Sequence, residues 1–271
     1  MMKRRLLAIA LLVTAPVALA DEDPGSKKGI CLSKNWGDTR KVEAMIGSLD
    51  VGWHYNWTGK WQGKDIKGVP FVPMIWGKTP WALAAIKEVR VAKSRGDSSP
   101  LLGFNEPDGK SQANMSVEES LDLWPQLEKT NRRLGSPVTV HADNEWMQAF
   151  MKGADERGYR VDFVCVHWYG GTDADKLVNL LERIHKLYGK PIWLTEFAPA
   201  DWKAKTRKDN EIKPAEVLDF MEEALPKLDK LEFLERYAWF SSLPDHPKLG
   251  PSALFNADGS LTPLGEAYAA H

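Results

Sequence analysis

Short apolar runs alternate with stretches of helical periodicity along almost the whole chain, and this alternation restricts the folds that the chain can adopt. Eight apolar runs occupy residues 29–33, 51–55, 71–75, 101–104, 138–141, 163–167, 192–195 and 237–240. Helical patterns lie between most of them, at 39–49, 81–94, 117–134, 145–157, 174–188 and 215–225, and a last one covers 263–269. Apolar strands separated by helices are typical of a parallel sheet with helices on its outer face. The sequence therefore predicts an α/β fold.

The number of runs favours a compact (β/α)8 TIM-like barrel, because eight strands in about 250 residues match the usual size of that fold. Residues 56–68, between the second and third runs, contain three glycines and no helical stripe, so we expect the helix there to be missing. Pro125 is expected to break or kink its helix, and Pro226 to end the helix before it. A doubly wound open sheet is the alternative, but the sequence lacks the glycine-rich phosphate turn that would support it.

The first twenty residues have the features of a secretory signal peptide. A basic start at Lys3 is followed by an apolar run at 6–13 and by small residues up to Ala20. We therefore expect residues 1–20 to be removed and residues 21–271 to form one catalytic domain that is secreted or periplasmic. No later stretch approaches 18 consecutive apolar residues, so no membrane partner is expected for the mature chain.

Charge and cysteine content narrow the function classes further. The formal net charge is −1, which lacks the basic excess that a nucleic-acid partner requires. The two cysteines, Cys31 and Cys165, each lie in an apolar run, which favours buried free thiols over a disulfide. Nothing in the sequence calls for a cofactor, and we expect a monomer.

Two of the apolar runs end in a glutamate that precedes a proline-marked turn. Glu106 is followed directly by Pro107, and Glu196 by Pro199 three residues later. In TIM-like barrels the chemistry lies at the C-terminal ends of the strands. Hydrolysis of a glycosidic bond uses two carboxyl groups, one protonated to donate to the leaving oxygen and one ionised. Each glutamate taken alone is also compatible with capping a helix or pairing with an arginine.

Aromatic and amide side chains gather at the same predicted strand ends. The chain has 12 tryptophans, and an indole face stacks well on the apolar face of a sugar ring. Trp81 and Trp124 are expected to be packing residues instead. The residues at the outgoing strand ends are Trp36, Trp53, Tyr55, Asn56, Trp57, Trp76, Asn105, Glu106, Trp146, His167, Trp168, Tyr169, Glu196 and Trp239.

Four motifs in order resemble glycoside hydrolase family 128, a clan A family of β-1,3-glucanases with compact barrels. They are GFNEPD at 103–108, VHWYG at 166–170, WLTEFA at 193–198, and AWFSS with SALFNADGSLTPLGEAY at 238–268. The resemblance covers nearly the whole mature chain. It implies a secreted retaining endo-β-1,3-glucanase that acts by double displacement on β-1,3-glucan polysaccharide or oligosaccharides. Retention requires carboxyl groups about 5–5.5 Å apart.

The resemblance also implies roles for individual residues. Glu106 would be the acid/base and Glu196 the nucleophile. Asn105 would hold the 2-hydroxyl of the sugar at the cleavage point, Tyr169 would steady the nucleophile, and Trp239 would form the floor of that subsite. The remaining predicted substrate contacts are His167, Trp36, Trp53, Tyr55, Asn56, Trp76, Trp146, Trp168 and Trp202, the last in a lysine-rich loop at 200–214 that we interpret as a mobile lid.

Two other function classes remain open from the residues alone. One is a metal-dependent barrel hydrolase with His141, Asp143 and His167 as ligands and His54 as a further candidate. It leaves both glutamates without a role. The other is a non-catalytic β-glucan-binding protein, which explains the tryptophans but not the paired carboxylates.

Overall fold

The computed structural model describes residues 26–271, so the predicted signal peptide lies outside the described residues. Five parallel strands form one sheet in the order β2-β1-β5-β4-β3. They are β1 (Lys28–Cys31), β2 (Trp53–Tyr55), β3 (Val164–Trp168), β4 (Ile192–Phe197) and β5 (Leu234–Phe240). The α/β fold with a parallel sheet is confirmed.

Strands β2 and β3 form the two edges of the sheet. Three further segments, which pair through isolated parallel bridges, connect these edges and complete a ring. His54 pairs with Phe71, Met74 with Leu102, Leu101 with Leu134, and Gly135 with Phe163. These segments therefore occupy the remaining barrel positions, although none forms a continuous strand. At the fifth barrel position the bridges involve residues 134–138, so this segment begins several residues earlier than the predicted run at 138–141.

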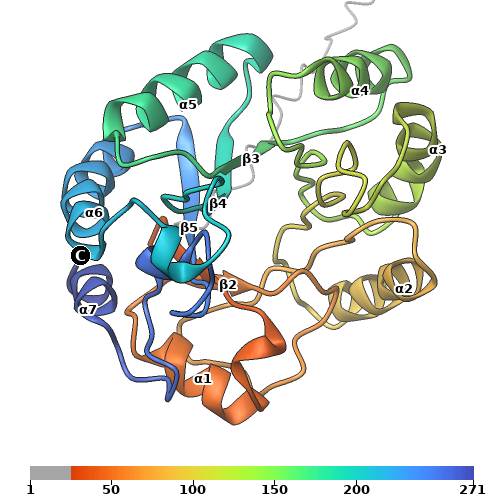
Figure 1. The fold of residues 1–271 in the computed structure, drawn as a ribbon. Helices are drawn as coiled ribbons and strands as arrows, with labels where there is room; N and C mark the ends of the chain where they lie inside the picture. The colour runs from red at the N-terminus through yellow and green to blue at the C-terminus, as the bar shows by residue number, and fades with distance from the viewer. Residues whose placement is uncertain (1–25) are drawn as a thin grey trace, which may run out of the picture.

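Helices surround this ring in an order that follows the chain (Figure 1). The expected gap is confirmed, because the described chain between β2 and residue 71 contains no helix. Side-chain caps begin several helices, for example Ser116 with its reciprocal partner Glu119. The helices are α1 (Thr39–Gly47), α2 (Pro80–Ser94), α3 (Val117–Glu128), α4 (Glu145–Glu156), α5 (Ala174–Tyr188), α6 (Pro214–Asp229) and α7 (Pro263–Ala270), with short 3-10 turns at Lys34–Trp36, Arg207–Asp209 and Gly250–Ser252.

Both helices continue past the prolines that were expected to end or disturb them. Helix α6 continues through Pro226 to Asp229, so the predicted end at residue 225 is wrong. Pro226 lies on the solvent side of α6, as does Glu222, whose carbonyl loses its N–H partner, while the buried Leu225 and Leu228 anchor the helix. Helix α3 likewise runs past Pro125 but ends at Glu128, short of the predicted 134.

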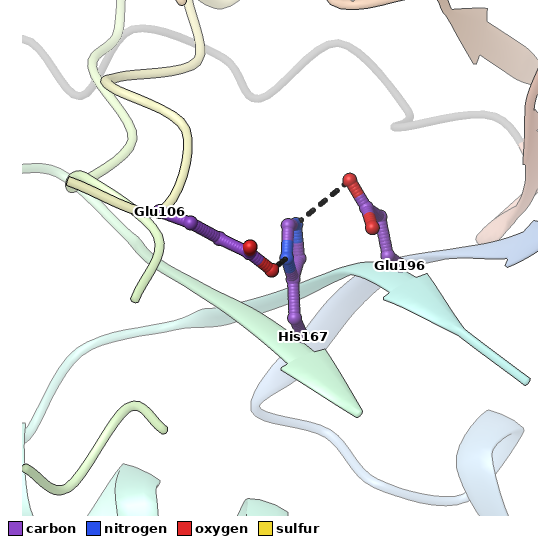
Figure 2. A group of neighbouring side chains, drawn as sticks. All are labelled: Glu106, His167 and Glu196. Carbon is purple, nitrogen blue, oxygen red and sulfur yellow. Dashed lines mark hydrogen bonds and ion pairs between the residues drawn. The ribbon is translucent and has the colours of Figure 1, made fainter. Parts of the chain in front are cut away.

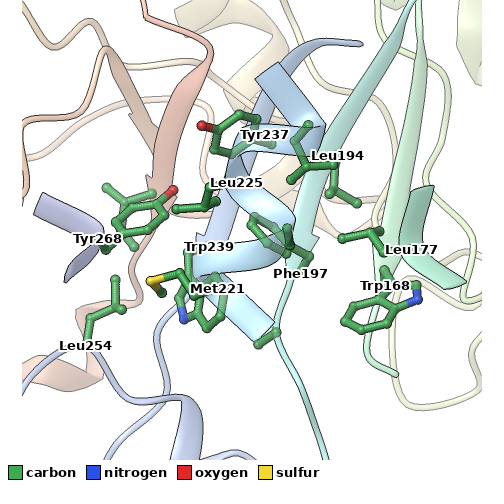
Figure 3. Packing of buried hydrophobic residues seen from close by; sticks show 14 of the residues in the cluster. Trp168, Leu177, Leu194, Phe197, Met221, Leu225, Tyr237, Trp239, Leu254 and Tyr268 are labelled. Atoms are coloured by element: carbon green, nitrogen blue, oxygen red, sulfur yellow. The ribbon is translucent and has the colours of Figure 1, made fainter. Parts of the chain in front are cut away.

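The core has an inner and an outer layer. The barrel interior is filled by residues such as Trp53, Met74, Phe163 and Trp193. The outer layer lies between strands and helices, where Trp239, Phe197 and Met221 pack together (Figure 3). The position of a residue along its strand decides which layer it joins, because successive side chains of a strand point to opposite faces of the sheet.

Three of the sequence expectations about single residues have clear outcomes. Cys31 and Cys165 are free and buried, as expected. Trp124 is fully buried, but Trp81 is 52% exposed, so the prediction that Trp81 is a packing residue is wrong. None of the helices in the part of the chain that the structure describes combines the length and apolarity that crossing a bilayer requires.

Candidate active site

Glu106 lies at the mouth of the ring on a strained backbone. Its φ of 41° is in the left-handed region, which residues other than glycine seldom adopt. Its N–H donates to Val138 O at 2.7 Å, and Asp108 secures the turn by accepting hydrogen bonds from Val140 N and Asn144 Nδ2. Strain that the surroundings hold in place is common where a side chain must be aimed.

Glu196 reaches the same mouth through a β-bulge in β4. Between the pairs Leu194–Tyr237 and Phe197–Trp239, β4 contains one residue more than β5. The pairing with β3 shifts at the same place, where His167 lies opposite Glu196. Strict alternation from the inward Trp193 would turn Glu196 outward. The bulge instead turns it into the barrel mouth.

His167 stands between the two glutamates (Figure 2). Its Nδ1 is hydrogen-bonded to Glu106 Oε1 at 2.9 Å. Its Nε2 lies 3.1 Å from Glu196 Oε1, a charge contact without the alignment of a hydrogen bond. Burial by itself would lower the pKa of His167, but the negative charges of Glu196 and Glu106 outweigh it and raise that pKa. The imidazole is thus held toward its charged form.

Three side-chain donors converge on Glu196. The Tyr55 hydroxyl and the Trp57 indole both donate to Oε1, at 3.1 Å and 2.7 Å, and the Tyr169 hydroxyl donates to Oε2. Burial, followed by the charge of Glu196, raises the pKa of both tyrosines well above the usual value, so they remain donors. Hydrogen bonds from neutral donors favour an ionised carboxylate.

The carboxyl groups open into a cleft of about 1070 Å³ that is flanked by two smaller hollows. On one side a hollow of about 610 Å³ includes Trp76 and Trp81, whose rings lie 5.6 Å apart. On the other side a hollow of about 590 Å³ includes Trp202 and Lys248. Because Trp76 and Trp202 also line the central cleft, the three spaces adjoin one another, and together we call them the groove.

Several predicted contacts lie in this groove. Asn105 is buried beside the cleft, and its Oδ1 has no hydrogen-bond partner within the described chain. Asn56 lines the hollow next to Trp76. Trp202 is 55% exposed, and its indole N–H donates to Tyr169 O. These positions leave polar atoms and indole surface available to a ligand.

Trp168 faces outward from β3 and stacks on Phe220, but the 9% of its surface that stays exposed lines the cleft. Four other predicted contacts are placed away from the open cleft. Trp239 has no exposed surface, and strand alternation directs it to the helix layer, so it cannot form the floor of a subsite. The other three are Trp36, which packs on Phe255, Trp53, which fills the barrel interior, and Trp146, which stacks on Phe150.

Trp57 and Phe240 line the cleft, although the predicted set of substrate contacts did not include them. Phe240 is the inward neighbour of Trp239, so counting alternate residues along β5 would have found it. Trp57 was visible at a strand end, but its contact with Glu196 requires a φ of 62°, which no local pattern indicates.

The metal-ligand set suggested by the sequence does not assemble. The Asp143 carboxylate pairs with Arg183, and His167 is held by the two glutamates. Among residues 26–271, the group whose ligand atoms all lie within 4.8 Å of one another is Glu106, His167 and Glu196. In that group the imidazole itself occupies the space between the two carboxyl groups (Figure 2).

Comparison with protein families identifies the same architecture. The family described as glycosyl hydrolase catalytic core matches residues 31–268. A curated relative, alkali-sensitive linkage protein 1 of Schizosaccharomyces pombe, is 29% identical over 232 residues. The match covers 80% of this chain but only 40% of that protein.

Solved structures of glycoside hydrolase family 128 resemble the chain over most of its length. A subgroup I endo-β-1,3-glucanase from Amycolatopsis mediterranei, bound to laminarihexaose, is 38% identical with a TM-score of 0.77, covering 91% of this chain and 99% of that one. A subgroup II endo-β-1,3-glucanase from Sorangium cellulosum is 30% identical with a TM-score of 0.72, covering 90% and 97%. A subgroup III curdlan-specific exo-β-1,3-glucanase from Blastomyces gilchristii is 28% identical with a TM-score of 0.68, covering 92% and 100%.

Proposed function

The chain belongs to glycoside hydrolase family 128 and is a glycoside hydrolase, and on that premise we propose that it cleaves internal linkages of β-1,3-glucan with retention of configuration. The observation that carries the proposal is the arrangement of Glu106 and Glu196 on either side of His167 at the barrel mouth. Oxygens of the two carboxyl groups come within 4.8 Å of each other. That spacing is below the roughly 6.5–9.5 Å of inverting enzymes and favours direct attack by one carboxylate.

Glu196 is the proposed nucleophile. Three donors, from Tyr55, Trp57 and Tyr169, favour its ionised form and fix its orientation. It attacks the anomeric carbon while the bond to the leaving oxygen breaks, which gives a glycosyl ester on Glu196.

Glu106 is the proposed acid/base. In the first step it gives its proton to the leaving glycosidic oxygen, and in the second it takes a proton from the water that cleaves the ester. The 2.9 Å hydrogen bond to His167 holds the Glu106 carboxyl group in place for both steps, and the imidazole also contacts Glu196. His167 is therefore a positioning residue for both glutamates.

The shape of the groove supports action within a chain. Two separate hollows adjoin the cleft that contains the carboxyl pair, one with Trp81 and one with Trp202, so there is room for a polysaccharide to extend past the reaction centre along two paths. The structure of the endo-acting relative from Amycolatopsis contains laminarihexaose, a linear oligosaccharide, which also supports cleavage within a chain. We also propose that the enzyme is exported, acts as a monomer on β-1,3-glucan, and loses residues 1–20 on export.

One experiment tests linkage, stereochemistry and catalytic residues together. Laminarihexaose is digested by the wild type and by Glu196→Gln, and the anomeric protons of the first products are followed by NMR, with cellohexaose as the linkage control. The proposal expects β-anomers first from laminarihexaose, internal cleavage products, and loss of about a thousandfold or more in the variant. Initial α-anomers, or a fully active Glu196→Gln enzyme with unchanged melting temperature, would refute it.

A further inference from the structure

The missing helix leaves a second cavity on the outer side of the barrel. Between α1 and α2 the chain passes as a loop, whereas the neighbouring sectors carry helices (Figure 1). The cavity has a volume of about 820 Å³ and extends from Gly59 along α2 to Ser99 and Arg132. It shares no lining residue with the cleft that contains Glu106 and Glu196, and it shares only Trp61 with the hollow beside Trp76 and Trp81.

Two buried polar groups in its wall lack partners. His54 points outward from β2, is 1% exposed, and its Nδ1 makes no hydrogen bond within the described chain. Burial lowers its pKa to about 4, so near neutral pH the imidazole presents one donor and one acceptor. Arg132 is also 1% exposed, and its Nε has no partner although the rest of the guanidinium is bonded. Buried polar atoms without partners are uncommon and destabilising.

The rest of the wall indicates the chemistry of a ligand. Trp61 and Phe71 line the cavity with roughly parallel rings whose centroids are 6.0 Å apart, and the ring of His54 lies nearly perpendicular to Trp61 with centroids 4.8 Å apart. Indole surface next to unsatisfied donors and acceptors suits a sugar, which has apolar faces and a rim of hydroxyls. Acidic and basic groups nearly balance, which disfavours a strongly charged ligand; they are Lys60, Lys87, Arg95 and Arg132 against Asp65, Glu88 and Asp97.

We propose that this cavity is a second carbohydrate-binding site, which holds a neutral glucan chain away from the reaction centre. The identity of the polymer rests on the proposed function. A polysaccharide engaged at both places would be retained by an effective concentration that short oligosaccharides cannot exploit, because they cannot span the two sites. The second site therefore strengthens the binding of long or insoluble glucan and has no such effect on short oligosaccharides.

Indole N–H signals provide a direct test. The full chain carrying Glu196→Gln is labelled with ¹⁵N, the Trp61 signal is assigned by comparison with Trp61→Phe, and laminarihexaose is titrated in. The proposal expects the Trp61 signal to shift with its own saturation curve, apart from those of Trp57 and Trp202 in the cleft and of Trp76 and Trp81 in the hollow that Trp61 also lines. Movement of the cleft signals alone, or a Trp61 signal that follows the curve of Trp76 and Trp81, would overturn it. A Trp61 signal that moves with protein concentration in the absence of sugar would identify a second copy as the occupant, which also overturns it.

His54→Phe separates binding from structure. It keeps the aromatic contacts with Trp61 and Phe71 but removes the ring nitrogens. If the unpartnered nitrogens serve a ligand, binding at Trp61 weakens by about tenfold, and the ratio of the rate on insoluble glucan to the rate on laminaritriose falls. The melting temperature should stay the same or rise, since a buried unsatisfied group is removed. Unchanged affinity and an unchanged rate ratio would show that His54 is only a packing residue.

Failure of the proposed function would be visible separately. If β-1,3-glucan is not the substrate, the wild type leaves laminarihexaose uncut, whatever happens at Trp61. The same titration with cellohexaose then decides the second site. A shift of the Trp61 signal with a saturation curve different from that of Trp76 and Trp81 supports a carbohydrate site, and no such shift with either sugar rejects it.

Discussion

The indole Nε1 of Trp57 donates a hydrogen bond of 2.7 Å to Oε1 of Glu196. The bond depends on a left-handed backbone at Trp57, with a φ of 62°. An unusual conformation of a bulky residue is thus maintained where its side chain meets a catalytic candidate, which is where backbone strain tends to be concentrated.

Replacing Trp57 by phenylalanine should slow catalysis while leaving the fold intact. Trp57→Phe keeps an aromatic ring beside Tyr55 and Phe240 but removes the donor to Glu196. A hydrogen bond to a charged group contributes about 1.5–3 kcal/mol, so we expect kcat to fall by roughly 10- to 100-fold with little change in KM. Trp202→Phe is the matched control, because that indole donates to a backbone carbonyl instead. Equal losses of kcat in both variants would contradict the assignment.

Glu106→Ala should distinguish the acid from the nucleophile. A glycoside with a good leaving group, such as a dinitrophenyl β-laminaribioside, needs no proton for bond cleavage, so formation of the ester on Glu196 should stay fast. Laminarihexaose should be cut about a thousandfold more slowly. Stopped-flow measurement should therefore show a burst of dinitrophenol followed by slow turnover. A variant equally impaired on both substrates would reverse the two assignments.

His167 should make stability depend on pH with a defined sign. The pKa of His167 is raised in the folded state by Glu196 and Glu106 against the opposing effect of burial. Its contribution is therefore fully present below the unfolded value of about 6.5 and is lost as the pH rises through the folded pKa. The difference in free energy of unfolding between wild type and His167→Gln should be larger at pH 6 than at pH 9 in urea titrations. A difference that grows with pH would argue against a charged imidazole.

Trp81 should matter for long substrates only. Its ring is 52% exposed and lies 5.6 Å from that of Trp76, at the far end of the groove. Trp81→Ala should raise the KM for laminarihexaose by about tenfold and leave laminaritriose hydrolysis nearly unchanged. Leu83→Ala, at an exposed position of α2 outside the groove, serves as the control. An effect of equal size on the trisaccharide would place Trp81 outside the substrate path.

The hydrophobic pattern predicted the fold class because each barrel position needs an apolar segment whether or not it forms a regular strand. Segments 71–75 and 101–104 are apolar yet pair only through bridges. The boundaries were less predictable. A proline inside a helix removes one backbone hydrogen bond, and this loss is tolerated more easily on an exposed face of the helix. Pro226 lies on such a face, and α6 continues past it.

The sequence indicates which residues lie at the strand ends, but whether their side chains enter the cleft depends on the direction in which each one points. Trp239 was selected for its position and type, but alternation along β5 directs it outward and brings Phe240 into the cleft. Glu196 shows the opposite case, since alternation alone would turn it outward and the bulge at Thr195 and Glu196 reverses it. Bulges arise from pairing between distant segments, which a linear pattern does not reveal.

The two carboxyl groups come from parts of the barrel that pair differently. Glu196 and its donors Tyr55, Trp57 and Tyr169 stand on or shortly after strands of the continuous sheet, whereas Glu106 follows a segment that pairs through isolated bridges and backbone hydrogen bonds. The separation of the two carboxyl groups therefore depends on how these two parts of the ring pack against each other, and a substitution in either part can change it without touching a glutamate.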